Sequence, residues 1–295
     1  MTKKGYEQVF RCKMGKIFDA LEKANHQRTT KTKAVPHAKR FERKTVQRAQ
    51  NVVALGNAKK VALGQILDPK LIAYHAPQSA GAEHFKVLRT NLLFPSTGEP
   101  PRRILITSAL PNDGKSFIAA NLATSIAQGI EEHVMLIDCD LRKPTAHNYF
   151  GFSQMVGLSE YLASGSDLAK FLLKSAVPKL TLLPAGNAPQ NPTELLSSKK
   201  MKALLDEVAK RYDDRYIIID SPPPTVASET NALVNLVDGV ILVVRSGKTP
   251  KDAVSETIAQ IGKEKILGIV LNYSELSSKK YYGYGKKYYA KATIG

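Results

Sequence analysis

The chain is poor in cysteine, has no tryptophan and lacks any long apolar segment. Its two cysteines, Cys12 and Cys139, are too few for a disulfide framework, and Cys139 falls inside a predicted buried strand, so a reducing cytosol fits. No apolar run approaches the ~18–20 residues that span a membrane. The basic N-terminus is followed by no apolar stretch of signal-peptide length. These absences predict a cytoplasmic protein, which can still sit at a membrane surface.

Positive charge is concentrated at the two ends of the chain. The formal charge of +17 includes +12 from residues 1–66, where 16 basic residues accompany 4 acidic ones, and +5 from residues 279–295. The 212 residues between these ends are neutral and are ample for one packed domain. We therefore expect a basic extension over 1–66, a domain over 67–275 and a tail over 276–295.

The basic extension is largely unpatterned, with one exception. Met14, Ile17, Phe18 and Leu21 fall on one face of a predicted short amphipathic helix near 13–24. This helix could dock on a partner, on anionic lipid or on the chain's own domain, and these alternatives stay open. The extension as a whole could bind lipid headgroups, nucleic acid or acidic proteins, or could act only as a solubilising arm.

The central region alternates between predicted strands and helices. The predicted strands are apolar on both faces, and they are Ile104–Ser108, Val134–Asp138, Tyr216–Asp220, Gly239–Val244 and Ile266–Leu271. The predicted helices include Lys115–Gln128, Thr193–Arg211 and Pro250–Gly262. Such strands alternating with helices indicate a mostly parallel sheet with helices on both faces. The predicted fold class is therefore α/β.

A phosphate-binding loop follows the first of these strands. The segment Ala109-Leu-Pro-Asn-Asp-Gly-Lys-Ser116 lies between a strand and a helix, which is the context that a P-loop needs. Gly114 lets the backbone close around phosphate, Lys115 reaches the β- and γ-phosphates, and Ser116 can hold Mg²⁺. Ala109 stands where the P-loop pattern has its first glycine. The predicted nucleotide-binding residues are Pro111, Asn112, Asp113, Gly114, Lys115, Ser116 and Phe117.

Carboxylates follow two further predicted strands at the point where each strand ends. Asp138 and Asp140 lie at the end of one strand, and Asp220 ends another. The carboxyl ends of parallel strands meet at one edge of the sheet, where ligands bind. Three acids beside a phosphate loop suit one or two Mg²⁺ ions and a group that activates a nucleophile. The pattern predicts phosphoryl-transfer chemistry.

These motifs resemble those of a known family. The P-loop, the Asp138-x-Asp140-x-Arg142 segment and the Asp220-Ser-Pro-Pro223 segment are similar to the Walker A, A′ and B motifs of bacterial tyrosine kinases. Those proteins are the autokinases of capsular and exopolysaccharide synthesis. The resemblance covers about residues 75–275, including Leu183-Pro-Ala-Gly186 and Asn191-Pro-Thr-Glu-Leu-Leu196. It implies a P-loop NTPase fold and an ATP-dependent, non-specific protein-tyrosine kinase.

The resemblance also implies roles for the site residues. The implied catalytic residues are Lys115, Asp138, Asp140 and Arg142, and the implied metal ligands are Ser116, Asp138 and Asp220. The implied cofactors are ATP and Mg²⁺. A tyrosine hydroxyl has a pKa of ~10, so it needs a nearby carboxylate or a strong electrostatic pull to attack at neutral pH. The sequence leaves open whether Asp138 or Asp140 is the base.

The C-terminal tail is the predicted phosphoacceptor. Five of the twelve tyrosines lie in the last fifteen residues, among glycines and lysines, at Tyr281, Tyr282, Tyr284, Tyr288 and Tyr289. From Tyr273 to Tyr289, ~17 residues of extended chain reach ~50–60 Å, so phosphorylation between subunits is expected. Each phosphate adds about −1.5 to −2 charges, so several phosphates would change the net charge of the tail from positive to negative. A single-stranded nucleic-acid grip is the less favoured alternative.

A further motif and the absence of membrane spans suggest partners. Glu83-x-x-Lys86-x-x-Arg89 resembles the Glu-x-x-Arg-x-x-Arg helix through which the family forms rings, although lysine lacks the bidentate fork of arginine. A surface charge ladder is the other interpretation. The resemblance implies a separate membrane-spanning polysaccharide co-polymerase adaptor, which would activate the kinase and recruit it to the inner face of the cell membrane. It also implies a cognate tyrosine phosphatase.

Other functional classes remain to be weighed. Partition and division-site ATPases share this sheet and use nucleotide to control dimerisation without phosphorylating protein. They carry a lysine five residues before the P-loop lysine, where this chain has Leu110. A catalytically weak scaffold for a polysaccharide machine is a third possibility. An ordinary eukaryotic-type kinase is excluded, because no His-Arg-Asp or Asp-Phe-Gly sequence occurs.

Overall fold

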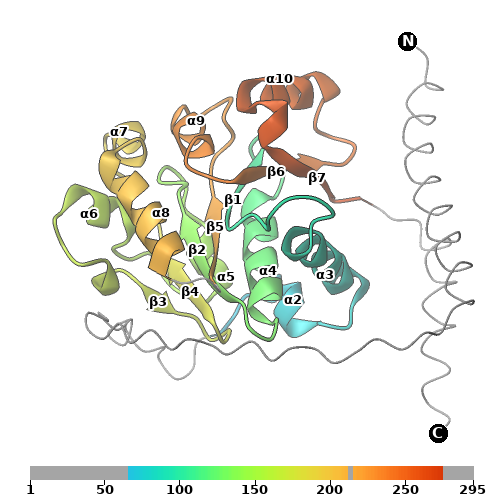
Figure 1. The fold of residues 1–295 in the computed structure, drawn as a ribbon, viewed down its shortest axis with the longest axis horizontal. Coiled ribbons are helices and arrows are strands. Elements are labelled where there is room, and N and C mark those ends of the chain that lie inside the picture. Colours follow the sequence, from blue (N-terminus) through green and yellow to red (C-terminus); the bar gives the residue numbers. More distant parts are fainter. Residues whose placement is uncertain (1–65, 212–214, 275–295) are drawn as a thin grey trace, which may run out of the picture. The chain divides into compact units, whose positions relative to one another are not determined.

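A computed structural model describes residues 66–211 and 215–274. The predicted helix near 13–24, nearly all of the basic extension and the five predicted acceptor tyrosines lie outside these residues. The described residues form a seven-stranded sheet with helices packed on both of its faces, as the sequence predicts (Figure 1).

The sheet has the strand order β3-β4-β2-β5-β1-β6-β7. Its strands are β1 (Arg103–Ser108), β2 (His133–Asp138), β3 (Leu173–Lys174), β4 (Leu180–Leu183), β5 (Arg215–Asp220), β6 (Gly239–Arg245) and β7 (Ile266–Asn272). All neighbouring pairs are parallel except β3 and β4. The order places β1, β2 and β5, the strands that lead into the three sequence motifs, side by side at the centre. Their carboxyl ends therefore meet at one edge of the sheet.

Helices connect the parallel strands. They are α2 (Ile72–His75), α3 (Ala80–Leu93), α4 (Lys115–Ala127), α5 (Ala146–Tyr149), α6 (Leu158–Ala163), α7 (Pro192–Leu196), α8 (Lys199–Arg211), α9 (Glu229–Val234) and α10 (Lys251–Ile261), with short 3-10 helices at Leu168–Lys170 and Lys263–Lys265. The prediction of one helix over Thr193–Arg211 is wrong, because α7 ends before Ser197 and α8 begins at Lys199. Ser198 starts the second helix by accepting a hydrogen bond from the Met201 amide at 3.1 Å.

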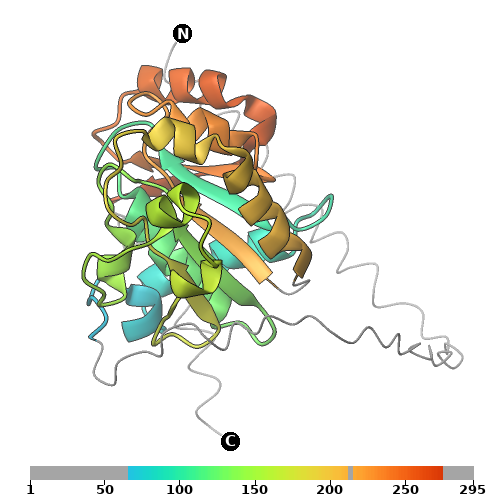
Figure 2. The same ribbon diagram turned by 90° about the vertical axis from the view of Figure 1, so that its left-hand side faces the viewer.

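Helices cover both faces of the sheet (Figures 1 and 2), and each face has its own apolar cluster. Along β1, Ile104 and Ile106 pack with α3 and α4, whereas Leu105 packs with α8 and α9 on the opposite face. This alternation explains why the central strands are apolar at nearly every position. Helix α4 is buried on almost all sides, since α2 and α3 cover its outer surface. Within residues 66–211 and 215–274, no helix has the length and apolarity needed to cross a membrane.

Candidate active site

The loop between β1 and α4 has the backbone shape of a phosphate-binding loop. Gly114 caps the N-terminus of α4 with φ of 96°, and Asn112 also has a positive φ, of 67°. A Cβ on Gly114 would collide with the side-chain amide of Asn272 at the end of β7. Position 114 therefore requires glycine both for its left-handed backbone and for lack of space. The amides at the start of α4 are directed toward the site, as anion binding requires.

Asp113 supports this loop from within the protein. One oxygen of its carboxylate accepts a hydrogen bond from the Leu110 amide at 3.1 Å, and the other accepts one from the Thr249 hydroxyl at 2.8 Å. The Asp113 carbonyl accepts a third from the side chain of Asn272 at 2.9 Å. The sequence predicts Asp113 among the nucleotide-binding residues, whereas in the structure its side chain is buried beneath the loop. Thr249 and Asn272, which no sequence motif indicates, hold the loop in place through these hydrogen bonds.

An open pocket of about 580 Å³ lies over the loop. It is lined by Pro111, Asn112, Gly114, Lys115, Ser116, Phe117, Asp140, Arg142, Lys143, Thr145, Tyr149, Pro222, Pro223, Val226, Ala227 and Tyr273. All of the predicted nucleotide-binding residues except Asp113 are in this set, and so are three of the four implied catalytic residues, Lys115, Asp140 and Arg142. The volume is in the range of small-molecule sites.

Asp138 and Asp220 lie below the pocket, opposite each other on the paired strands β2 and β5. Burial, followed by the charge of Asp220, raises the pKa of Asp138 well above its usual value. The backbone amide of Asp140 donates to one Asp138 oxygen at 3.1 Å. The amides of Thr145 and Ala146 donate to the other at 3.2 and 3.1 Å. Asp138 thus shapes the turn that carries the second acidic motif.

Asp220 has no such partners. Both of its carboxylate oxygens are buried, and neither makes a hydrogen bond within the described residues. Burial raises its pKa to about 6, while the charge of Lys115 and the nearby Ser116 hydroxyl act in the opposite direction. A buried carboxylate without donors next to a P-loop serine fits a bound Mg²⁺ ion. No group of three or more His, Cys, Asp or Glu side chains forms a metal site in the described part of the chain, so phosphate and water would supply the remaining ligands.

Lys115 and Asp140 form an ion pair at the floor of the pocket. Their side-chain nitrogen and oxygen are 2.9 Å apart, and both side chains are largely buried. Asp140 also accepts a hydrogen bond from the Lys143 amide at 3.0 Å. Burial alone would lower the pKa of Lys115, but the charges of Asp220 and Asp140 outweigh it and raise the pKa. Lys115 is therefore held as a cation beneath the pocket.

Arg142 makes a two-pronged ion pair with Glu229 on α9. The Arg142 Nε lies 2.7 Å from one Glu229 oxygen, and its Nη2 lies 3.3 Å from the other. This interaction raises the pKa of Arg142. Burial opposes ionisation of Glu229, yet the hydrogen bonds that it accepts lower its pKa overall. Sequence reasoning did not identify Glu229, because it lies on a short helix outside every motif.

Two tyrosines that the sequence motifs do not predict also line the pocket. Tyr149 ends α5, and its pKa is raised to about 12 by burial and by the charge of Asp220, so its hydroxyl stays protonated. Tyr273 follows β7 in a left-handed conformation, and the Arg245 guanidinium lies 4.3 Å from its ring centre. Ligands generally bind at the carboxyl ends of parallel strands, and the position of Tyr273 directly after the last predicted strand is the one signal that could have indicated it.

The predicted oligomerisation residues lie on α3. Lys86 pairs with Glu83 at 3.1 Å within the same helix. Arg89 donates to the Ser125 carbonyl at 2.8 Å, at the carboxyl end of α4. Part of the Arg89 guanidinium therefore stabilises the fold of its own domain. Self-association through these residues stays a prediction.

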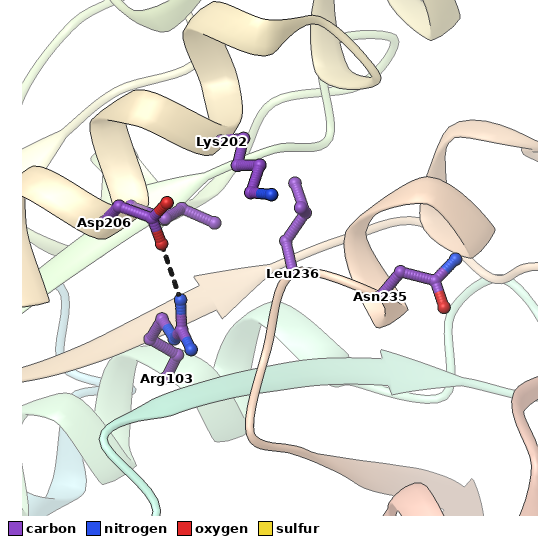
Figure 3. Close-up of a pocket in the computed structure, with 6 residues that line it drawn as sticks. Arg103, Lys202, Asp206, Asn235 and Leu236 are labelled. Atoms are coloured by element: carbon purple, nitrogen blue, oxygen red, sulfur yellow. Dashed lines mark hydrogen bonds and ion pairs between the residues drawn. The ribbon is translucent and has the colours of Figure 1, made fainter.

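A smaller pocket of about 190 Å³ lies between α8, the start of β1 and the segment after α9 (Figure 3). Its main cation, Arg103, pairs with Asp206 at 3.1 Å and with Asp238 at 3.0 Å. Because the Arg103 guanidinium is paired with two carboxylates, its positive charge is already balanced within the protein. The pocket is also at the amino ends of the strands, the end of the sheet opposite to the phosphate loop.

Comparison with known proteins is consistent with this geometry. Residues 108–266 match the model of a family described as an AAA domain. The tyrosine-protein kinase YwqD of Bacillus subtilis strain 168 is 39% identical over 223 residues, which cover 75% of this chain and 93% of that protein. A putative tyrosine-protein kinase EpsB of Ralstonia solanacearum is 33% identical over 220 residues, which cover 74% of this chain but 29% of that protein. The solved kinase domain of the Escherichia coli tyrosine kinase ETK is 32% identical with a TM-score of 0.64, covering 72% of this chain and 84% of that one.

Proposed function

Because the chain belongs to the family of bacterial tyrosine kinases, we propose that this protein-tyrosine kinase uses ATP and Mg²⁺ to phosphorylate its own C-terminal tyrosines. The kinase domain in this proposal is 67–275, and the acceptor tail is 276–295. The acceptors are Tyr281, Tyr282, Tyr284, Tyr288 and Tyr289.

One observation carries the proposal. Tyr273, which directly follows the last strand, lines the pocket over the phosphate loop, and Tyr281 follows it by only eight residues. The acceptor segment is thus joined covalently to the wall of the site. Eight extended residues reach ~26 Å, and the ~17 residues to Tyr289 reach ~50–60 Å. These lengths permit transfer to a neighbouring subunit.

The phosphates of ATP are proposed to bind at the start of α4. The backbone amides of the loop and the Lys115 ammonium would hold them, and Ser116 with Asp220 would hold Mg²⁺. When bound, the ion supplies positive charge that offsets charge on the phosphates. The ring of Tyr273, fixed by Arg245, offers an aromatic face to the adenine base.

Asp140 is the better placed of the two candidate bases. It lines the pocket, whereas both oxygens of Asp138 already accept backbone hydrogen bonds beneath it. A base must approach the hydroxyl that it deprotonates within ~2.6–3.2 Å. We therefore assign the tyrosine proton to Asp140 and a supporting role in the loop to Asp138. ATP phosphates would draw Lys115 away from Asp140 and free this carboxylate.

Regulation and partners extend the proposal. Phosphorylation of several tyrosines would convert the +5 charge of residues 279–295 to a net negative charge, which would change the contacts of the tail. We propose a homo-oligomer, which includes ring-shaped assemblies, in which one subunit phosphorylates the tail of the next. A membrane-spanning polysaccharide co-polymerase adaptor would recruit the kinase to the inner membrane face during capsule or exopolysaccharide synthesis. A tyrosine phosphatase would reverse the modification.

The test is phosphotyrosine mapping on the purified full chain incubated with labelled ATP and Mg²⁺, with and without a candidate adaptor. We expect label on the tail tyrosines, and its loss in Lys115→Met. Tyr74→Phe, which removes a tyrosine from α2, is the matched control and should leave the label unchanged. ATP hydrolysis with no phosphotyrosine would reject the kinase proposal in favour of a switch ATPase.

The direction of transfer needs a second arrangement of the same assay. A chain carrying Lys115→Met is mixed with an active chain whose five tail tyrosines are replaced by phenylalanine. Label on the inactive chain is the expected result, because it can come only from another subunit. An unlabelled inactive chain, beside a normally labelled wild type, would show transfer within one chain.

A further inference from the structure

Glu229 is a buried carboxylate at the first position of α9, and its side chain is only 1% exposed. It accepts hydrogen bonds from Arg142 Nε at 2.7 Å and from Arg142 Nη2 at 3.3 Å. The hydroxyl of Thr193, in α7, donates a further bond at 3.1 Å. A buried charge is costly unless it is paired and hydrogen-bonded, and these donors meet that requirement.

The two ends of the Arg142 guanidinium have different surroundings. Nε and Nη2 are fixed by Glu229, whereas the side chain as a whole is 51% exposed and lines the pocket beside Asp140. Nη1 makes no hydrogen bond to any residue in the described part of the chain. The planar fork of arginine allows one edge to be anchored while other N–H groups remain available.

We propose that Glu229, assisted by Thr193, is a positioning residue that fixes the Arg142 guanidinium so that Nη1 contacts the phosphoryl group during its transfer to tyrosine. This inference rests on the proposed kinase function. It adds two residues, from α7 and α9, to a site otherwise built from the three sequence motifs. It also gives a role to the Asn191-Pro-Thr-Glu-Leu-Leu196 segment, which the motifs leave unassigned.

The transfer requires a fixed cation at this place. The tyrosine oxygen forms a bond to the γ-phosphorus, the bond from that phosphorus to the bridging oxygen breaks, and the electron pair leaves with ADP. The phenolic proton passes to Asp140. Negative charge is spread over the oxygens of the moving phosphoryl group, so a preorganised guanidinium stabilises the transition state. Arg142 without Glu229 would sample other rotamers, and its charge would be less well placed.

The alternative is that Glu229 only stabilises the packing of α7 against α9. Kinetic measurements separate this stabilising role from the positioning role. Loss of a stabilising residue lowers the fraction of folded enzyme and adds to the effect of any other mutation. Loss of a positioning residue lowers the turnover of each folded enzyme, and has little further effect once Arg142 is absent. A double-mutant cycle with Arg142 therefore distinguishes them.

The experiment uses the full chain, with an inactive full-length copy as acceptor and ATP·Mg²⁺ as donor. The kcat, the KM for ATP and the number of nucleotide-binding sites are measured, so that turnover refers to folded enzyme. Glu229→Gln should lower kcat by ~10²-fold, the usual effect of losing one preorganised charge contact, and change the KM for ATP by less than about two-fold. Arg142→Ala should give a similar loss, and the double variant should be no slower than Arg142→Ala alone.

Two further variants complete the design. Thr193→Val leaves the ion pair intact and should lower kcat by ~3–10-fold, so it carries the test if Glu229→Gln does not fold. Glu160→Gln removes a carboxylate from the first turn of α6 that does not line the pocket, and should leave kcat unchanged. Wild-type kcat in both Glu229→Gln and Thr193→Val, or additive losses in the cycle, would overturn the inference. Absence of tyrosine phosphorylation by the wild type would instead reject the proposed function.

Discussion

Replacement of Asp220 by asparagine should stabilise the protein in the absence of nucleotide and Mg²⁺, while it abolishes kinase activity. Burial, which the charge of Lys115 and the nearby Ser116 hydroxyl only partly offset, raises the pKa of Asp220 from 3.8 to about 6. Each pKa unit corresponds to about 1.4 kcal/mol, so the ionised carboxylate costs the folded state about 3 kcal/mol at pH 8. Asparagine has nearly the same shape and no charge, and removes most of this cost.

The pH dependence of this gain follows from the direction of the shift. The folded state holds the Asp220 proton more tightly than the unfolded chain does, because its pKa is the higher of the two. The cost is therefore absent below the unfolded pKa of 3.8, grows as the pH rises to about 6, and is complete above that. The stability gained by Asp220→Asn should accordingly be close to 3 kcal/mol at pH 8 and should shrink toward zero as the pH falls to ~4.

Urea unfolding in EDTA at pH 5 and pH 8 measures this difference, provided that the slopes of the two proteins agree. Asp238→Asn is the matched control with the opposite sign. Asp238 accepts hydrogen bonds from the backbone and side chain of Arg103, which lower its pKa despite partial burial, so this variant should lose stability at both pH values. If Asp220→Asn were no more stable than wild type at pH 8, the argument that burial of the Asp220 charge outweighs its compensation by Lys115 and Ser116 would be refuted.

Three further predictions concern ATP binding, measured by titration with a fluorescent ATP analogue. Gly114→Ala should weaken binding by at least ~10-fold, because a left-handed residue with a Cβ costs ~1–2 kcal/mol even without its collision with Asn272; unchanged affinity would contradict the loop geometry. Tyr273→Ala should raise the Kd by ~5–10-fold through loss of base stacking, whereas Tyr273→Phe should stay within about two-fold, and equal effects of the two would exclude stacking. Asn272→Ala removes one hydrogen bond to Asp113 and should weaken binding by ~3–10-fold, with wild-type affinity as the contrary result.

The central sheet could be predicted because its strands are buried on both faces. Val134–Asp138 and Tyr216–Asp220 are apolar without interruption, and both lie in the structure within one residue of the predicted bounds. The division of α7 from α8 was not predictable in the same way. Ser197 and Ser198 are acceptable inside a helix, and only the hydrogen bond from the Met201 amide to Ser198 shows where a new helix begins.

The motifs gave the composition of the site but not the function of each member. Asp138 and Asp140 have the same side chain and lie two residues apart, yet three backbone amides surround Asp138 while Asp140 lines the pocket. That difference depends on how the turn after β2 folds, which spacing does not specify. Asp113 and Glu229 likewise acquire their places through contacts with residues 136 and 87 positions away in the chain, and Tyr273 acquires its place at the end of the last strand.

The hydrogen bond from Asn272 to Asp113 makes the order of synthesis relevant to the enzyme. The phosphate loop ends at residue 116, but its support arrives only with residue 272, after β7 has paired with β6. A growing chain that has left the ribosome as far as α10 therefore has the loop sequence without the loop's final support. The tyrosines proposed as acceptors, which begin at Tyr281, are translated immediately after this support. A newly made subunit thus completes the support of its phosphate loop and its proposed acceptor segment at nearly the same moment.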